Sequence, residues 1–322
     1  MTALPEKCLS HLKEKTVKLP NVTGFSQDLK PRIRKGKEAP REQVVRVYVA
    51  RKLPREALTD AQLIPGKIEG VPTDVVEIGE LKTMDLTAQS GPGLDAYAGK
   101  IRPVTAGWSC GNEKSQSAGT IGCIVSVGSW EGILSNNHVL ARCSNIEGHK
   151  ASRWEGILQP GVFDGGKFPD DFIAFLYKWT DLSIFGVNRV DRAIALFARN
   201  TAYRVGIQDI GLVRGLRQAE VGLDVQKTGR TSGREEGKVI DTNAFVSVSY
   251  GEIIGKALDC EHQILIAPSI SAPGDSGSLV TSKDSDVVGH LFAGSPQVTV
   301  ANHIADSLEG LGAEIVGSVG VA

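Results

Sequence analysis

The chain has 322 residues, which is enough to bury a large core and to form about two domains. It carries 36 Lys+Arg and 37 Asp+Glu, a formal net charge of −1, and 41% of its residues are hydrophobic. No global electrostatic field therefore indicates nucleic acid or a membrane surface as the partner. No run of about 18 apolar residues is present, so no segment is expected to span a bilayer.

Positive charge is concentrated near the N-terminus. Residues 1–41 contain ten Lys/Arg and four Asp/Glu, and the densest run is LKPRIRKGK at 29–37. We interpret this run as a solvated, flexible arm, with nucleic-acid contact as an accessory alternative only. The first twenty residues lack the apolar stretch of an export signal. We therefore expect a cytoplasmic protein whose five widely spaced cysteines are reduced thiols.

The first third of the chain predicts a small α+β unit. Residues 43–53 alternate around three valines and predict a strand, and PREALTDAQ at 54–62 opens on a proline suited to a helix start. VPTDVVEIGEL at 71–81 predicts another strand, and the Gly-, Ala- and Ser-rich stretch at 87–107 predicts a linker. We assign residues 1–105 to this unit, including the basic arm and the linker.

From about residue 117 the chain predicts an all-β domain. Eight or more short apolar runs alternate with glycine-bearing turns, as in GTIGCIVSVGS and AFVSVSYG, and helical patterns are few. The tail is the exception, because Ile304, Leu308, Leu311 and Ile315 recur at helical spacing. We expect a closing helix there.

A Gly-Asp-Ser-Gly sequence at 274–277 stands before an apolar run. It suits a polar hairpin turn, but it also suits a nucleophilic Ser276 whose own amide and that of Gly274 point at a developing oxyanion. A serine hydroxyl needs a base to become nucleophilic, and histidine is the usual one. Of the six histidines, His138 is the best presented, at the end of an apolar strand in GILSNNHVLAR.

These two motifs, ILSNNHVLA and PGDSGSLV, resemble the histidine and serine motifs of trypsin-like serine peptidases. Residues 117–310 carry the resemblance, and GVNRVDRAIAL and GRTSGREEGKV are similar to a bacterial, non-secreted branch of that family. The resemblance implies a mainly β fold over 106–322. It would be a chymotrypsin-like double antiparallel β-barrel, divided near 205–220, with a C-terminal helix and the α+β unit in front. It also implies a serine endopeptidase that works through an acyl-enzyme on protein or peptide substrates, without metal or organic cofactor.

The resemblance requires an acid between His138 and Ser276, where an Asp opens an apolar strand. Asp191 in RVDRAIALF fits and is our choice, since NRVDRAIA resembles the motif of the branch. Asp171 in PDDFIAFLY fits locally and remains the competitor.

Regulation is a further expectation. In animal relatives the carboxylate at the position of Asp275 pairs with an amino terminus freed by cleavage, and Lys100–Ile101 in GKIRPV is a candidate bond for such activation. An activating protease or a regulatory partner would then be required. The alternative function is a catalytically silent or autoinhibited peptide-binding module on the same fold, with residues 1–100 as the inhibitor. An α/β-hydrolase is excluded, because GDSGS lacks the last glycine of the nucleophile elbow and alternating long helices are missing.

The resemblance also assigns a substrate pocket. Ile270 stands six residues before the serine, where an acid would select Arg or Lys, so we expect a preference for small or apolar side chains before the cleaved bond. Ser271, Phe292 and Gly294 are the other expected pocket residues. Cys123 and Cys143 stand near the positions of a family disulfide, but we expect two buried thiols there.

Overall fold

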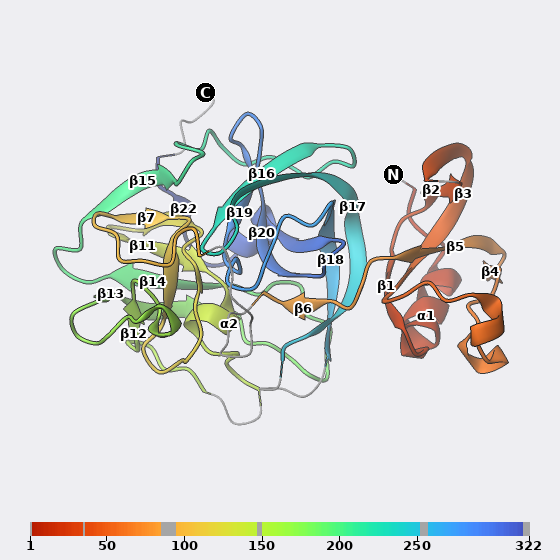
Figure 1. Cartoon of the computed structure of the whole chain (residues 1–322), viewed down its shortest axis with the longest axis horizontal. Helices are drawn as coiled ribbons and strands as arrows, with labels where there is room; N and C mark the ends of the chain where they lie inside the picture. Colours follow the sequence, from red (N-terminus) through yellow and green to blue (C-terminus); the bar gives the residue numbers. More distant parts are fainter. Residues whose placement is uncertain (1, 35, 85–94, 147–149, 252–256, 318–322) are drawn as a thin grey trace.

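The computed structural model describes residues 2–34, 36–84, 95–146, 150–251 and 257–317. The structure is mainly β, with two large antiparallel sheets and an N-terminal unit at one end (Figure 1). None of the helices in these ranges is long and apolar enough to cross a bilayer.

The first sheet forms a curled, eight-stranded body. Its core is a cluster of small and branched apolar side chains, among them Ile124, Ile133, Leu134 and Ile194. In spatial order its strands are β22 (Glu314–Ile315), β10 (Cys123–Val127), β11 (Trp130–Ser135), β14 (Ala193–Phe197), β13 (Phe172–Trp179), β12 (Gly156–Leu158), β8 (Ser109–Asn112) and β9 (Gly119–Thr120).

Six strands of the second, twelve-stranded sheet close into a barrel, since the sixth of them pairs back with the first. Closure removes the free edges that an open sheet would leave. The strands of this barrel, in spatial order, are β16 (Asp224–Gly229), β19 (Leu279–Ser282), β20 (Val287–Gly294), β21 (Thr299–His303), β18 (Ala257–Ala267) and β17 (Gly233–Ser249).

Short elements complete this part of the chain. A parallel pair, β7 (Val104–Ala106) with β15 (Tyr203–Ile207), lies beside the first sheet. The helical segments of this part are α2 (Asn137–Leu140), η4 (Val162–Asp164) and α3 (Ile304–Leu308). Together these sheets are the double antiparallel β-barrel predicted from the sequence.

The N-terminal unit is continuous with the second barrel. Its strand β1 pairs with β17, and the ring of Phe25 stacks on that of Phe245 with centroids 4.9 Å apart. The elements of the unit are α1 (Glu6–Glu14), η1 (Thr16–Lys18), β1 (Val22–Ser26), β2 (Lys30–Arg34), β3 (Lys37–Val49), η2 (Arg55–Ala57), η3 (Asp60–Gln62), β4 (Lys67–Ile68), β5 (Val71–Glu77) and β6 (Lys82–Thr83). In Figure 1 the orange segment carrying β6 leaves this unit and enters the body of the molecule.

The prediction of a flexible basic arm at 29–37 is wrong. Within this run Lys30–Arg34 form β2 and Lys37 begins β3, and Lys30 is buried with its ammonium 2.7 Å from the carboxylate of Asp241 in β17. Arg34 pairs with Glu42 across the same two strands at 2.7 Å. The positive charges are thus matched by acids that lie far away in sequence or on the opposite strand, which a local count of charge does not detect.

Two helix predictions also need correction. Residues 54–62 form two short 3-10 turns instead of one helix, because Thr59 interrupts them and bonds to the side chain of Gln62. The C-terminal helix is present but ends at Leu308, since Gly310 and Gly312 both adopt a φ of 66°. Ile315 then pairs with Val125 in the first sheet.

Candidate active site

His138 and Asp191 meet at the end of the first sheet. His138 lies in α2 directly after β11, and Asp191 precedes β14, which pairs with β11. Nδ1 of His138 lies 2.5 Å from Oδ2 of Asp191, and the backbone N–H of His138 donates to Oδ1 at 3.3 Å. Both residues are buried. The carboxylate thereby fixes the orientation of the ring and holds a proton on Nδ1, so that Nε2 is the nitrogen suited to proton exchange.

Tyr250, at the end of β17, is a third member of this cluster that sequence reasoning missed. Its hydroxyl donates to Oδ2 of Asp191 at 2.9 Å, and its ring meets that of His138 edge-on with centroids 5.9 Å apart. The side chain of Asn136 donates to the carbonyl of Asp191 at 2.7 Å and holds its backbone. The motif VSVSYG gives no spacing signal for Tyr250, because its role depends on the second barrel lying against the first.

The electrostatics of the cluster favour an ionised Asp191. Burial alone would raise the pKa of its carboxyl, but the charge of His138 and the hydrogen bonds from His138 and Tyr250 outweigh burial and lower the pKa. Burial, followed by the charge of Asp191, raises the pKa of Tyr250 well above its ordinary value. Tyr250 therefore remains a hydrogen-bond donor at neutral pH.

Asp171, the competing acid, lies elsewhere. Its carboxylate is 2.6 Å from the ammonium of Lys100 and accepts the backbone N–H of Lys167 at 2.9 Å. Burial would raise its pKa, but the hydrogen bonds from Lys100 and Lys167 lower it. Of the two candidate acids, Asp191 is the one that the structure brings to His138.

Ser276 lies in the turn before β19, and two glycines shape that turn. Gly274 and Gly277 have φ values of 103° and 98°, which disfavour any residue with a side chain. A Cβ at Gly277 would fall 2.2 Å from the hydroxyl of Ser135. The turn is tied to the first sheet because the carbonyl of Ser276 accepts the N–H of Thr120 at 2.7 Å.

The packing of Gly119 shows how close the serine lies to the histidine helix. A Cβ at Gly119 would lie 2.5 Å from the side chain of Val139 and 3.0 Å from the carbonyl of Ser276. The Ser276 turn and the residue that follows His138 therefore flank the same glycine. The hydroxyl of Ser276 donates to the carbonyl of Phe292 in β20 at 3.2 Å, and Ser276 itself is 0% exposed.

The Asp275 carboxylate is neutralised inside the second barrel. The ammonium of Lys227 in β16 lies 2.7 Å from Oδ2, and both side chains are 0% exposed. The backbone N–H groups of Thr231, Ser232 and Ala272 also donate to this carboxylate, at 2.9, 3.2 and 2.9 Å. A free amino terminus at Ile101 is not required for this purpose, since Lys227 already supplies the cation.

The predicted pocket residues divide into two groups. Ile270 is buried in an apolar cluster of the second barrel together with Met84, and Ser271 and Gly294 lie beside the end of the Met84 side chain. Phe292 contributes its carbonyl to the site, but its ring packs in a different cluster with Leu81 and other side chains. The large ring therefore fills space on the other side of β20 from Met84.

The cysteines are buried thiols, as expected. Cys123 lies in the core of the first sheet, whereas Cys143 belongs to the cluster around Phe292. Among the residues that the structure describes, no group of three or more His, Cys, Asp or Glu side chains is placed to hold a metal ion.

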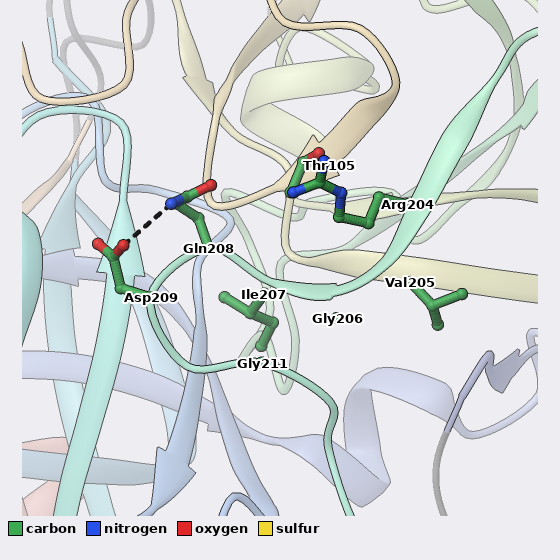
Figure 2. Close-up of a pocket in the computed structure, with 8 residues that line it drawn as sticks. All are labelled: Thr105, Arg204, Val205, Gly206, Ile207, Gln208, Asp209 and Gly211. Atoms are coloured by element: carbon green, nitrogen blue, oxygen red, sulfur yellow. Dashed lines mark hydrogen bonds between the residues drawn. The ribbon is translucent and has the colours of Figure 1, made fainter.

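A separate pocket of about 210 Å³ opens beside β7 and β15 (Figure 2). Its one marked interaction is the hydrogen bond from Gln208 to Asp209 at 2.9 Å. None of the candidate residues described above contributes to it. Its lining residues are Thr105, Arg204, Val205, Gly206, Ile207, Gln208, Asp209 and Gly211.

Comparison with known proteins gives structural likeness only. No protein-family model and no curated protein matches the sequence. Similar solved structures include a glutamic-acid-specific serine protease, with 17% identity, a TM-score of 0.46 and coverage of 66% of this chain and 100% of that one. A Nocardiopsis protease has 16% identity and a TM-score of 0.45, covering 66% and 98%. An alpha-lytic protease homologue has 19% identity and a TM-score of 0.45, covering 65% and 97%.

The strand topology identifies the fold independently of these comparisons. A curled antiparallel sheet supplies His138 and Asp191, and a closed antiparallel barrel supplies Ser276. In its arrangement of strands this chain has the chymotrypsin-like double β-barrel fold of the trypsin-like serine peptidases.

Proposed function

We propose that the protein is a serine endopeptidase in which His138, Asp191 and Ser276 form the catalytic triad. The observation that carries the proposal is the buried His138–Asp191 pair, 2.5 Å apart, next to a serine turn shaped by Gly274 and Gly277. A histidine held by a carboxylate in one tautomer is what activates a serine hydroxyl. A protein or peptide substrate is supported by β20, whose residues Ala293 and Gly294 pair with an added strand beside the Ser276 turn.

The reaction proceeds in two halves. Nε2 of His138 takes the proton of Ser276 while the hydroxyl oxygen attacks the carbonyl carbon, and the backbone amides of Gly274 and Ser276 bind the oxyanion. His138 then protonates the leaving amine, and an acyl-enzyme remains on Ser276. Water, activated by the same imidazole, hydrolyses this ester. Asp191 stays ionised throughout, which is consistent with its lowered pKa.

The apolar surroundings of Ile270 support a preference for an apolar side chain before the cleaved bond. Ile270 is 1% exposed and clusters with Ile266 and Leu291. A cationic Arg or Lys side chain would have to be desolvated there without a partner carboxylate.

A fluorophosphonate probe tests the proposal directly, because it reacts covalently with an activated serine. The measurement is peptide mapping of the adduct on the wild-type protein and on the full-length variant M84D. In this variant a carboxylate replaces the apolar side chain of Met84, which packs with Ile270. We expect the adduct on Ser276 and none in S276A. A lack of any adduct on Ser276 in both proteins would reject the peptidase and leave the alternative.

That alternative is a peptide-binding or regulatory module that holds a segment without cleaving it. The complete burial of Ser276 beneath the chain's own residues favours it. It predicts no adduct on Ser276 even in M84D, which separates it from the peptidase.

A further inference from the structure

The segment that links the N-terminal unit to the first sheet is bound along β20 as an added strand. Lys82 and Thr83 of β6 pair in antiparallel fashion with Gly294 and Ala293. A peptide that extends a sheet edge in this way is a common mode of peptide recognition, in which main-chain hydrogen bonds fix the register. The edge is the same one that the proposed function assigns to the substrate.

The register carries Met84 to the reacting groups. Its N–H donates to the carbonyl of Phe292 at 3.3 Å, the carbonyl that also accepts the Ser276 hydroxyl at 3.2 Å. Its own carbonyl accepts the N–H of Gly274 at 2.6 Å. Gly274 supplies one of the two oxyanion amides, so the carbonyl of Met84 occupies the place where a scissile carbonyl would be polarised.

The side chain of Met84 is held as a substrate side chain would be. Met84 is 6% exposed and lies in the apolar cluster that contains Ile270, the residue expected at the base of the pocket. A Cβ at Gly294 would lie 3.0 Å from the terminal methyl of Met84 and 2.8 Å from the hydroxyl of Ser271. A flexible, unbranched thioether suits this narrow apolar space.

Upstream contacts hold the segment in that register. The carbonyl of Leu81 accepts the N–H of Ser249 at 2.9 Å, and the Ser295 hydroxyl bonds to the carbonyl of Ile78. Gly79 has a φ of 82°, and a Cβ there would fall 2.3 Å from the side chain of Gln297. Residues 78–81 are therefore held against the second barrel by specific hydrogen bonds and close packing.

We infer that the protein cleaves its own chain after Met84, with Lys82–Met84 as the residues bound before the scissile bond. The inference rests on the proposed function and identifies its first substrate. The Ser276 oxygen attacks the Met84 carbonyl carbon, and its proton passes to His138. The C–N bond to Asp85 breaks, and the amine of Asp85 leaves with that proton. Water then hydrolyses the Met84–Ser276 ester, which returns the serine hydroxyl and leaves a carboxylate at Met84.

The N-terminal fragment would stay attached after this cleavage. β1 of the first fragment remains paired with β17 of the second. The Lys30–Asp241 ion pair at 2.7 Å and the Phe25–Phe245 stack likewise join a residue before the cut to a residue after it. Only the short stretch through Met84 has to withdraw for the cleft to admit another peptide. We therefore expect residues 1–84 and 85–322 to co-elute under native conditions.

The experiment compares purified full-length wild type with S276A, M84D and M84L by intact mass and N-terminal sequencing. We expect fragments 1–84 and 85–322 from wild type and M84L, with Asp85 as the new N-terminus. We expect intact chains from S276A, which lacks the nucleophile, and from M84D, which places a charge in the apolar pocket. M84L is the matched control, since it keeps an apolar side chain of similar size. Wild type mixed with S276A should leave the S276A chain uncut, because the cleaved segment is held within its own molecule.

Fluorophosphonate labelling of M84D separates this inference from the proposed function. Labelling at Ser276 with no cut after Met84 in wild type would overturn self-cleavage and leave the peptidase standing. A cut at Lys100–Ile101 in place of Met84–Asp85 would overturn the register, as would cleavage of S276A in the mixture. Absence of labelling in every protein that contains Ser276 would overturn both proposals.

Discussion

The Lys227–Asp275 pair offers the sharpest test of how the serine turn is stabilised. The change is K227M, which keeps a side chain of similar length and removes the cation. Its ammonium lies 2.7 Å from the carboxylate, and both side chains are 0% exposed. At that separation two unit charges attract by about 6 kcal/mol if the effective dielectric constant is about 20.

Part of that attraction offsets the cost of burying the two charges, so the loss on removal is smaller than the whole. Asp275 keeps the amides of Thr231, Ser232 and Ala272 as donors. Removing one partner of a buried pair usually costs ~3–5 kcal/mol, because the other charge is left without compensation. We expect K227M to lower the free energy of unfolding by that amount, and to lower kcat as the turn that presents the Gly274 amide loosens.

Urea unfolding of wild type and K227M at neutral pH gives the free energies directly. The control is K238M, since Lys238 lies 2.6 Å from Asp224 but the two side chains are 50% and 61% exposed. An exposed pair of this kind contributes only about 0–1 kcal/mol. If K227M lost no more stability than K238M, the argument that Lys227 secures the turn would be refuted.

Three further predictions concern the histidine cluster. D191N should lower kcat about 10⁴-fold while the chain remains folded, which steady-state kinetics on a peptide substrate and circular dichroism would show. Asp191, with its lowered pKa, stabilises the fold above about pH 3.9, its unfolded pKa, and this stability is lost as pH falls through the folded value. Y250F removes a donor that lowers that pKa, so its acid unfolding midpoint should move to higher pH; an unchanged midpoint would contradict the role of Tyr250. His290 lies in β20, with its Nε2 3.4 Å from the side-chain nitrogen of Asn136. Burial lowers the pKa of His290 to about 4, so stability present above pH 6.5 is lost as pH falls toward 4. Between pH 7 and pH 5 wild type should lose about 2 kcal/mol from this group, whereas H290N should not; equal losses in urea titrations would contradict it.

Apolar runs and glycine turns predicted an all-β domain, because these are local signals, and the resemblance of two motifs to trypsin-like peptidases implied the double barrel. The sequence also singled out His138, Asp191 and Ser276 as candidates. The structure brings His138 and Asp191 into hydrogen-bond contact, while their catalytic role stays a prediction. Long-range contacts were not available to the same reasoning. Tyr250 contacts Asp191 only because β17 of the second barrel lies against the first barrel, and no sequence motif around Tyr250 predicts this contact.

The basic run at 29–37 and the segment KTM at 82–84 show the same limit more strongly. Lys30 looked solvated because its partner, Asp241, is 211 residues away in the sequence and lies in the second barrel. KTM at 82–84 was assigned to no element, because nothing in three residues indicates pairing with β20. Local composition describes what a segment could do alone, and in both places a distant strand decided what it does.

The buried pair and the bound segment together constrain how activity could be controlled. In the animal trypsin-like peptidases that the serine motif resembles, the carboxylate at the position of Asp275 pairs with an amino terminus freed by cleavage. Here Lys227 supplies the cation within the intact chain, and the amide of Gly274 already donates to a carbonyl. One of the two amides assigned to the oxyanion, that of Gly274, is therefore in place before any bond is cut. Under our proposals, control depends on whether Met84 occupies the cleft, and not on whether the cleft is formed.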